Sequence, residues 1–209
     1  MYIPASFRID DPEALDRFIE DYSFATLVSV CGESPLATHL PLLLDRERRV
    51  LLGHVARANP HAKVFGSKSE SLAIFNGPHA YISPSWYATA PAVPTWNYAV
   101  VHVYGPLEAL SENRTRELVD LTVDKYESTR PAPWPNELPQ DFRTKMLSAI
   151  VGFEMPIARI EGKFKLGQNR SEADQLAMLS HLQSAGPDAR SLSEFISRHQ
   201  KSNDPDVPL

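Results

Sequence analysis

The sequence FATLVSVCGESPLATHLPLLLDRERRVLLGHV, which spans residues 24–55, decides the fold class of this chain. Its apolar stretches are rich in Val, Leu and Thr and alternate with short polar segments, a pattern typical of β-strands. We expect strands at Phe24–Cys31, Leu36–Leu44 and Val50–Val55, with turns at Gly32–Pro35 and Asp45–Arg49. Links this short join neighbouring strands, so the stretch predicts an antiparallel meander.

The flanking segments add helices and further strands. Asp11-Pro12 and Asn59-Pro60 each place a capping side chain before a proline, which predicts a helix start. Further strand patterns occur at 71–75, 80–83, 96–110 and 151–166, and helix patterns at 111–126 and 141–150. Capping boxes at Ser171 and Ser191 predict two C-terminal helices. Strands first, with helices inserted and added at the end, predict an α+β fold around a small antiparallel barrel.

Length and composition limit the class of protein. The 209 residues carry a formal net charge of -5, so no global field attracts polyanions. The single cysteine, Cys31, excludes an intramolecular disulfide and fits a small buried residue at a strand end. No apolar run is long enough to span a membrane and no leader pattern is present, so we expect a soluble, untargeted protein with no membrane partner. We expect one domain over residues 1–200 and a polar tail at 201–209.

Familiar catalytic and nucleotide-binding motifs are absent from the sequence. It contains neither a G-x-G-x-x-G fingerprint nor a Walker A lysine loop, so a Rossmann site and a P-loop are unsupported. No G-x-S-x-G frame supports a serine hydrolase. Five histidines lack metal-ligand spacing, which favours structural or organic-ligand roles and no metal site: His39, His54, His61, His79 and His102.

Aromatic and polar residues are instead concentrated in two segments, 76–87 and 93–98. Such segments suit a flat ligand with polar edges, although core or dimer packing is an equal alternative for their rings. The junction Gly53–Lys63 runs from a strand into a helix start and carries Arg57 and Lys63 around the Asn59 cap. A phosphate fits such a junction, and the alternative is that both cations are simply solvated.

Five blocks of the sequence together resemble the PaiB-like FMN-binding negative transcriptional regulators. The blocks are Met1–Pro4 with Phe7, Gly53–Pro60, Phe75–Tyr87, Val93–Tyr98 and Lys165–Arg170. The resemblance implies an antiparallel split β-barrel with flanking helices and C-terminal helices. It further implies a bacterial, cytoplasmic homodimer with FMN between the subunits.

The resemblance also implies which residues contact the flavin. Thr38 and His39 resemble the strand beside the flavin, His54 is a further flavin contact, and Arg57, Asn59 and Lys63 become the phosphate-side candidates. Tyr81 and Ser83 resemble the neighbouring strand, Trp96, Asn97 and Tyr98 are placed to close the cleft, and Gln168, Asn169 and Arg170 to cap it. The family usually has Ser where this chain has Gly167, so one polar contact is missing from the last block.

The negative transcriptional regulation implied by the resemblance would require a DNA-binding surface if the chain contacts DNA directly. The sequence has no helix-turn-helix pattern, zinc finger or basic helix. Only two local basic clusters are available, Arg46–Arg49 and Arg159–Arg170, so DNA is a weakly supported partner. Two alternatives stay open: a flavin (FMN)-dependent oxidoreductase or reductase acting on a small molecule, and a flavin-sensing regulator that acts through protein partners.

Overall fold

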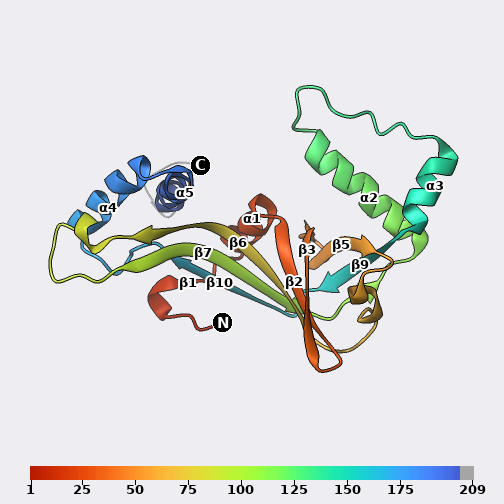
Figure 1. Cartoon of the computed structure of the whole chain (residues 1–209), viewed down its shortest axis with the longest axis horizontal. Helices are drawn as coiled ribbons and strands as arrows, with labels where there is room; N and C mark the ends of the chain where they lie inside the picture. Colours follow the sequence, from red (N-terminus) through yellow and green to blue (C-terminus); the bar gives the residue numbers. More distant parts are fainter. Residues whose placement is uncertain (203–209) are drawn as a thin grey trace. The chain divides into compact units, whose positions relative to one another are not determined.

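A computed structural model of the chain describes residues 1–202 (Figure 1). The helices are α1 (Pro12–Asp21), α2 (Glu112–Glu127), α3 (Gln140–Ser148), α4 (Glu172–Ser184) and α5 (Pro187–Ser202), with short 3-10 turns η1 (Ala5–Phe7), η2 (Pro60–Lys63) and η3 (Pro84–Trp86). The strands are β1 (Arg8–Ile9), β2 (Phe24–Cys31), β3 (Ser34–Pro41), β4 (Leu43–Asp45), β5 (Val50–Ala56), β6 (Ser71–Ile82), β7 (Thr95–Gly105), β8 (Glu108–Ala109), β9 (Ile150–Pro156) and β10 (Arg159–Lys165). The strand pairs are antiparallel, which confirms the predicted α+β class.

The chain divides into two compact units, each assembled from separate segments. The first unit comprises Met1–Asp11, Asn76–Val101 and Glu161–Leu209, and the second comprises Pro12–Phe75 and His102–Ile160. The single domain expected over residues 1–200 stays a prediction.

In the first unit the strands lie in the order β1-β10-β7-β6. Helices α4 and α5 pack on each other and contribute Met178, Leu182 and Leu192 to its core. Phe164 of β10 meets Phe195 of α5 edge to face, with ring centroids 5.2 Å apart. These contacts cover one face of the strands and leave the side chains of the other face for a different role.

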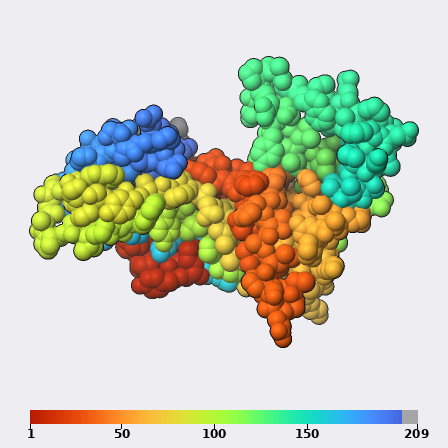
Figure 2. Space-filling model, viewed as in Figure 1, coloured from red at the N-terminus to blue at the C-terminus, as the bar shows by residue number. Residues whose placement is uncertain are grey.

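In the second unit β2 and β3 form a hairpin in register from Phe24 opposite Pro41 to Cys31 opposite Ser34, and the tip of this hairpin stands out from the surface (Figure 2). The first residues of β6 pair with the other edge of β2. A second sheet has the order β4-β5-β9-β8, and Leu118 of α2 packs on Val50 and Leu52 of β5. The hairpins are therefore as predicted, but they belong to two sheets.

Several boundaries differ from the sequence pattern. The expected strand Leu36–Leu44 is divided at Leu42, whose backbone N–H donates to Ser23 O, and it continues in the second sheet as β4. Strand β6 runs unbroken through Gly77-Pro78, whereas Pro156 ends β9. Helix α5 begins at Pro187 rather than after Ser191, because a proline suits the first helical turn.

Two other expectations concern single features of the chain. Cys31 is exposed and not buried, because it ends β2 directly beside the hairpin turn. The predicted tail, 201–209, begins inside α5, and residues 203–209 lie outside the described part of the chain. Within residues 1–202 no helix is both long and apolar enough to cross a membrane.

Candidate functional site

The predicted flavin contacts fall into one set in each unit. Those of the second unit are Thr38, His39, His54, Arg57, Asn59 and Lys63, and those of the first are Tyr81, Ser83, Trp96, Asn97, Tyr98, Gln168, Asn169 and Arg170. We describe each set by itself.

A hydrogen-bonded network joins Thr38 of β3 to the start of η2. The Asn59 side chain accepts from the backbone N–H of His61 at 2.9 Å, which caps η2. Because its oxygen is used in this cap, the Asn59 amide nitrogen faces Thr38 and donates to Oγ1 at 3.1 Å. The same Thr38 hydroxyl is hydrogen-bonded to His61 Nδ1 at 2.7 Å. Three side chains thus hold one another in a fixed arrangement.

His61 is the buried member of this network. Its side chain has no exposed surface, and its Nε2 atom has no partner among the described residues. Burial lowers the pKa of His61, because a charged imidazolium would lose its hydration. The sequence predicts a structural or organic-ligand role for His61, but it is not among the predicted flavin contacts. Its signal was the spacing Asn59-Pro60-His61, which places a ring two residues after a cap.

Thr38 and His39 point to opposite faces of their strand, because successive side chains alternate along β-structure. Thr38 lies opposite Leu27, which is fully buried, whereas His39 lies opposite Thr26 on the exposed face. His39 Nδ1 is hydrogen-bonded to Thr26 Oγ1 at 3.0 Å. Of the two, only Thr38 belongs to the network at η2.

The two predicted cations of this junction differ in their surroundings. Lys63 is exposed at the end of η2 and has no ion-pair or hydrogen-bond partner for its ammonium among the described residues. Arg57 turns instead to the end of α3, where Nε donates to Ser148 O at 2.8 Å and Nη2 to Ile150 O at 3.0 Å. The junction therefore offers Lys63 as its uncommitted cation.

His54 lies on β5 opposite Gly152 of β9. Alternation along the strand places it on the same face as Val50 and Leu52, which pack on α2. Burial lowers the pKa of His54 and favours the neutral ring.

In the first unit three aromatic side chains lie together on one face of β6 and β7. Tyr81 meets Trp96 edge to face, with ring centroids 6.0 Å apart, and about half of each side chain is exposed. His79 lies 6.2 Å from Trp96, and both line a shallow cavity of about 300 Å³ together with Tyr98. This open aromatic face fits a flat ligand or a second protein surface.

Two lysines of β10 border the aromatic face. The Nζ atom of Lys163 lies 5.2 Å from the centroid of the Tyr98 ring and donates to Tyr2 O. Lys165 donates to Thr95 Oγ1, and burial lowers the pKa of its ammonium. In the sequence these lysines belong to the local basic cluster Arg159–Arg170; in the structure Lys163 lies near the rings of Tyr2 and Tyr98, and Lys165 is hydrogen-bonded to Thr95.

Two neighbouring candidates are engaged away from this face. Asn97 is buried, and its amide donates to Met178 Sδ of α4 at 3.2 Å. Ser83 caps η3 by accepting from the backbone N–H of Ser85. Flavin contact by these two residues stays a prediction.

The segment Gln168–Arg170 forms a tight turn after β10. Gln168 folds back, accepting from Leu166 N and donating to Phe164 O. Gly167 has φ +93°, a conformation that side chains disfavour, which explains why this chain tolerates no Ser there without strain. The Arg170 guanidinium lies 4.2 Å from the Tyr87 ring centroid, and Asn169 is exposed.

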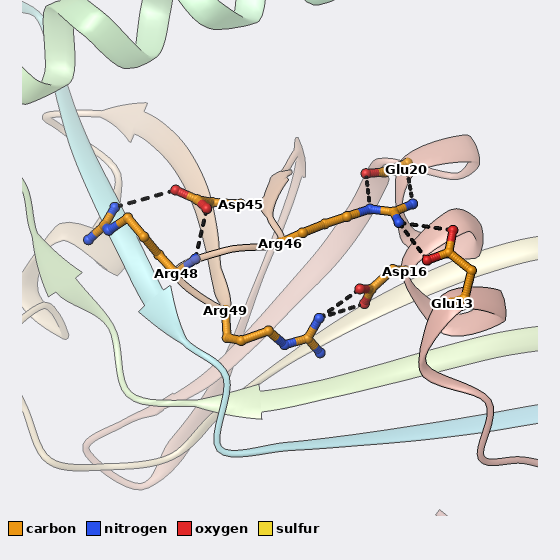
Figure 3. A network of polar contacts seen from close by, with 7 residues as sticks. All are labelled: Glu13, Asp16, Glu20, Asp45, Arg46, Arg48 and Arg49. Atoms are coloured by element: carbon orange, nitrogen blue, oxygen red, sulfur yellow. Dashed lines mark hydrogen bonds and ion pairs between the residues drawn. The ribbon is translucent and has the colours of Figure 1, made fainter.

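Carboxylates surround the first basic cluster, the turn Arg46–Arg49 (Figure 3). Arg46 forms paired hydrogen bonds with Glu13 and Glu20 of α1. Arg49 forms a bidentate pair with buried Asp16 at 2.7–2.8 Å. Arg48 pairs with Glu154 and lies 3.9 Å from Asp45. Five carboxylates face three guanidinium groups, so this turn is not a cationic surface.

The second basic cluster is also engaged within the protein. Arg159 lies 3.5 Å from the centroid of the Tyr104 ring and pairs with Glu70. Its other members, Lys163, Lys165 and Arg170, make the aromatic and hydrogen-bond contacts given above. No group of three potential metal ligands occurs within residues 1–202.

Comparisons with known proteins identify the family of this chain. A family model described as "Putative FMN-binding domain" matches residues 1–159. The protease synthase and sporulation protein PAI 2 of Bacillus subtilis is 36% identical over 201 residues, which cover 94% of this chain and 96% of the relative. The uncharacterized protein AN0679 of Emericella nidulans is 29% identical, covering 90% of this chain and 93% of that protein.

Solved structures show the same fold at low sequence identity. The FAD and heme binding protein from Mycobacterium smegmatis has a TM-score of 0.62 at 16% identity, over 81% of this chain and 78% of that one. The flavocytochrome Anf3 from Azotobacter vinelandii has a TM-score of 0.62 at 15% identity, over 76% of this chain and 69% of that one. These likenesses confirm the predicted split β-barrel class, in which the described sheets do not close into one barrel.

The family model matches more than half of the chain, which shows that this chain belongs to the family described as a putative FMN-binding domain. The chain is also similar to PAI 2 over most of its length. FMN is accordingly its cofactor.

Proposed function

We propose that this protein is an FMN-binding negative regulator of gene expression that holds the flavin phosphate at the start of η2. The observation that carries the proposal is the Thr38–Asn59–His61 network, which fixes donor groups beside an uncommitted cation. Similarity to a Bacillus protein named for protease synthesis and sporulation supports a regulatory role in a bacterial cytoplasm.

The donors present fit a phosphate. The Asn59 amide is locked in one orientation by its cap, so Thr38 Oγ1 receives one hydrogen bond from it in every state of the network. A buried N–H without an acceptor is rarer than an unpaired acceptor, so we infer that His61 carries its proton on Nδ1 and donates to Thr38. The Thr38 hydroxyl proton is then available to a ligand oxygen.

Lys63 completes the site as a charge. Its exposed ammonium can follow the phosphate dianion without breaking an existing ion pair, whereas Arg57 is held by the end of α3. We therefore place the phosphate on Thr38 and Lys63 rather than on Arg57. Bound FMN supplies electron transfer through its own ring system, and the protein residues bind and orient it.

The aromatic face of the first unit has a place in the same proposal. Tyr81, Trp96 and Tyr98 offer ring surfaces suited to the flavin or to a second subunit. The exposure of Trp96 at 54% and of Phe24 on β2 at 66% supports a homodimer in which such surfaces become covered. Sedimentation should then give about twice 23.4 kDa.

The ion pairs of the Arg46–Arg49 turn favour regulation through a protein partner over direct contact with DNA. Each arginine of the Arg46–Arg49 turn already has a carboxylate, so contact with duplex DNA would exchange existing ion pairs for phosphates at little net gain. We therefore propose a flavin-sensing regulator that acts through protein contacts rather than through a basic DNA-binding surface.

A visible spectrum recorded during FMN titration tests the cofactor part of the proposal. Saturable changes in flavin absorbance are expected, followed by slow or no oxidation of added NADH and NADPH. Rapid, repeated turnover of either nucleotide would favour the oxidoreductase over the regulator. A gel shift with duplex DNA that weakens steeply with salt would contradict regulation through protein contacts.

A further inference from the structure

A small cavity lies in the second unit among the start of α2, the end of α3 and the start of β9. Its volume is about 210 Å³, and it is lined by two arginines, Arg57 and Arg116, by one glutamate, by four aliphatic residues and by three residues that carry hydroxyl groups. Two arginines therefore share this lining with both apolar and polar groups. No residue of the Thr38–Asn59–His61 network lines it.

Both arginines of the cavity lack a carboxylate partner among the described residues. This is unusual within the unit, where other arginines form ion pairs: Arg46, Arg48, Arg49, Arg114, Arg130, Arg143 and Arg159. Arg17 also has none, but it does not line the cavity. Glu112 is the one acidic group in the lining, so the charged side chains there sum to a net positive charge.

Arg57 is fixed before any ligand arrives. Its Nε and Nη2 atoms hold the carbonyl groups of Ser148 and Ile150, which immobilises the guanidinium plane. A guanidinium carries five N–H donors, so three remain beyond these two bonds. Pre-fixed donors bind an anion at a lower cost in side-chain entropy.

The size of the cavity limits the ligand. Its volume is about 210 Å³. A flavin does not fit in this volume, and drug-sized ligands occupy about 300–1,000 Å³. The aliphatic wall formed by Leu110, Leu147, Ile150 and Val151 suits a short or branched apolar body, and Thr115, Thr144 and Ser148 add hydroxyl groups to the rest of the lining.

We propose that this cavity binds a small aliphatic carboxylate, with the carboxylate on Arg57 and Arg116 and the apolar body on the aliphatic wall. A carboxylate matches the forked guanidinium donors. The site is separate from the proposed phosphate site, and it gives the protein a second ligand.

The test uses the full chain loaded with FMN. The probe is 4-methylpentanoate, and its binding is measured by saturation-transfer NMR. Saturable binding is expected. The Arg116→Gln substitution should weaken the affinity for 4-methylpentanoate about 10- to 150-fold, which is the range for loss of one charged hydrogen-bonding partner. Arg114→Gln is the matched control, because Arg114 lies on the same helix, pairs with Glu117 and does not line the cavity.

Ligands that share the apolar body separate the possible causes of binding. The alcohol 4-methylpentan-1-ol and the amine 4-methylpentan-1-amine should both bind at least tenfold more weakly than the acid. The proposal would be overturned if the acid showed no saturable binding, if the alcohol bound as tightly as the acid, or if the amine bound more tightly. It would also be overturned if Arg116→Gln and Arg114→Gln lost the same affinity. Flavin absorbance of Arg116→Gln, expected to equal that of the unaltered chain, keeps this result distinct from failure at the phosphate site.

Discussion

The turn Arg46–Arg49 and the turn Asn59–Lys63 contrast in how their polar groups are used. The first has three arginines within four residues, and every one is paired with a carboxylate of α1, β4 or β9. The second has a single free cation, Lys63, beside side chains held in place by hydrogen bonds. The richer basic sequence is therefore the poorer anion site.

The difference teaches that available charge, rather than the number of cations, determines an anion site. Exposed ion pairs contribute little to stability, typically about 0–1 kcal/mol each, but they remove a guanidinium from use by a ligand. The pKa of Glu20 is lowered, first by its hydrogen bond from Arg46, which shows how strongly this turn is committed to its own acids. Variants in the two turns should accordingly affect different properties.

The largest expected effect is on FMN affinity in Asn59→Asp. The new side chain keeps an acceptor for the η2 cap, but it loses the donor to Thr38 and adds a negative charge near the phosphate. Since two like charges 4 Å apart repel by about 4 kcal/mol near a protein surface, FMN should bind about 100-fold or more weakly. Fluorescence titration measures this, with Asn113→Asp on exposed α2 as control. Equal FMN affinity of the two variants would contradict the placement of the FMN phosphate at this turn.

Arg49→Ala should instead lower the free energy of unfolding, by about 1–3 kcal/mol, because buried Asp16 loses its bidentate partner. Its FMN affinity should not change. Urea denaturation of Arg49→Ala is compared with that of Arg17→Ala, in which an exposed neighbour is removed and the change should stay within about 0.5 kcal/mol. Similar stability of both variants would show that the ion pairs of this turn are not structural.

Acid should destabilise the protein through one buried and two half-buried histidines. Burial lowers the pKa of His54, His61 and His199 in the folded protein. In the unfolded chain a histidine has its ordinary pKa near 6.5, so below that pH the unfolded chain binds protons more readily than the folded one. This contribution to stability is complete above about pH 7.5 and is lost as the pH falls through the lowered values. The free energy of unfolding, measured by denaturation at pH 7.5 and 5.5, should differ less between the two pH values for His61→Gln than for the unaltered chain. The exposed control His79→Gln should keep the full difference.

The smallest expected effect is on association with duplex DNA. If the Arg46–Arg49 turn made three phosphate contacts, replacing its arginines with Ala would reduce the slope of log affinity against log salt by about 2.7. We expect no change in this slope, because these groups are already paired. Fluorescence anisotropy over a salt series measures it, and a slope flattened by about that amount would restore the turn as a DNA contact.

Local chemistry predicted much of the fold. Asp11-Pro12 and Asn59-Pro60 start α1 and η2 as expected, because capping and the fixed proline φ act within a few residues. The β2–β3 hairpin likewise follows from alternation and a short turn. The division of the predicted strand Leu36–Leu44 at Leu42 depended on packing between distant segments, which periodicity does not record.

The site was less predictable for the same reason. Asn59 as a cap was readable from its neighbours, but its bond to Thr38 joins residues 21 positions apart. The sequence indicated Arg57 and Lys63 equally, and only the carbonyl groups at the end of α3 distinguish them. Likewise, the acids that neutralise Arg46 and Arg49 lie more than 25 positions away, on α1.

The ratio of FMN to riboflavin affinity in Lys63→Ala and Arg48→Ala tests the central claim most directly. Riboflavin lacks the phosphate, and one charge-assisted contact is worth about 1.5–3 kcal/mol. Lys63→Ala should therefore lower FMN affinity about 10- to 150-fold and leave riboflavin affinity nearly unchanged, while Arg48→Ala changes neither. Equal losses for FMN and riboflavin in Lys63→Ala, or a selective loss of FMN in Arg48→Ala, would contradict the account.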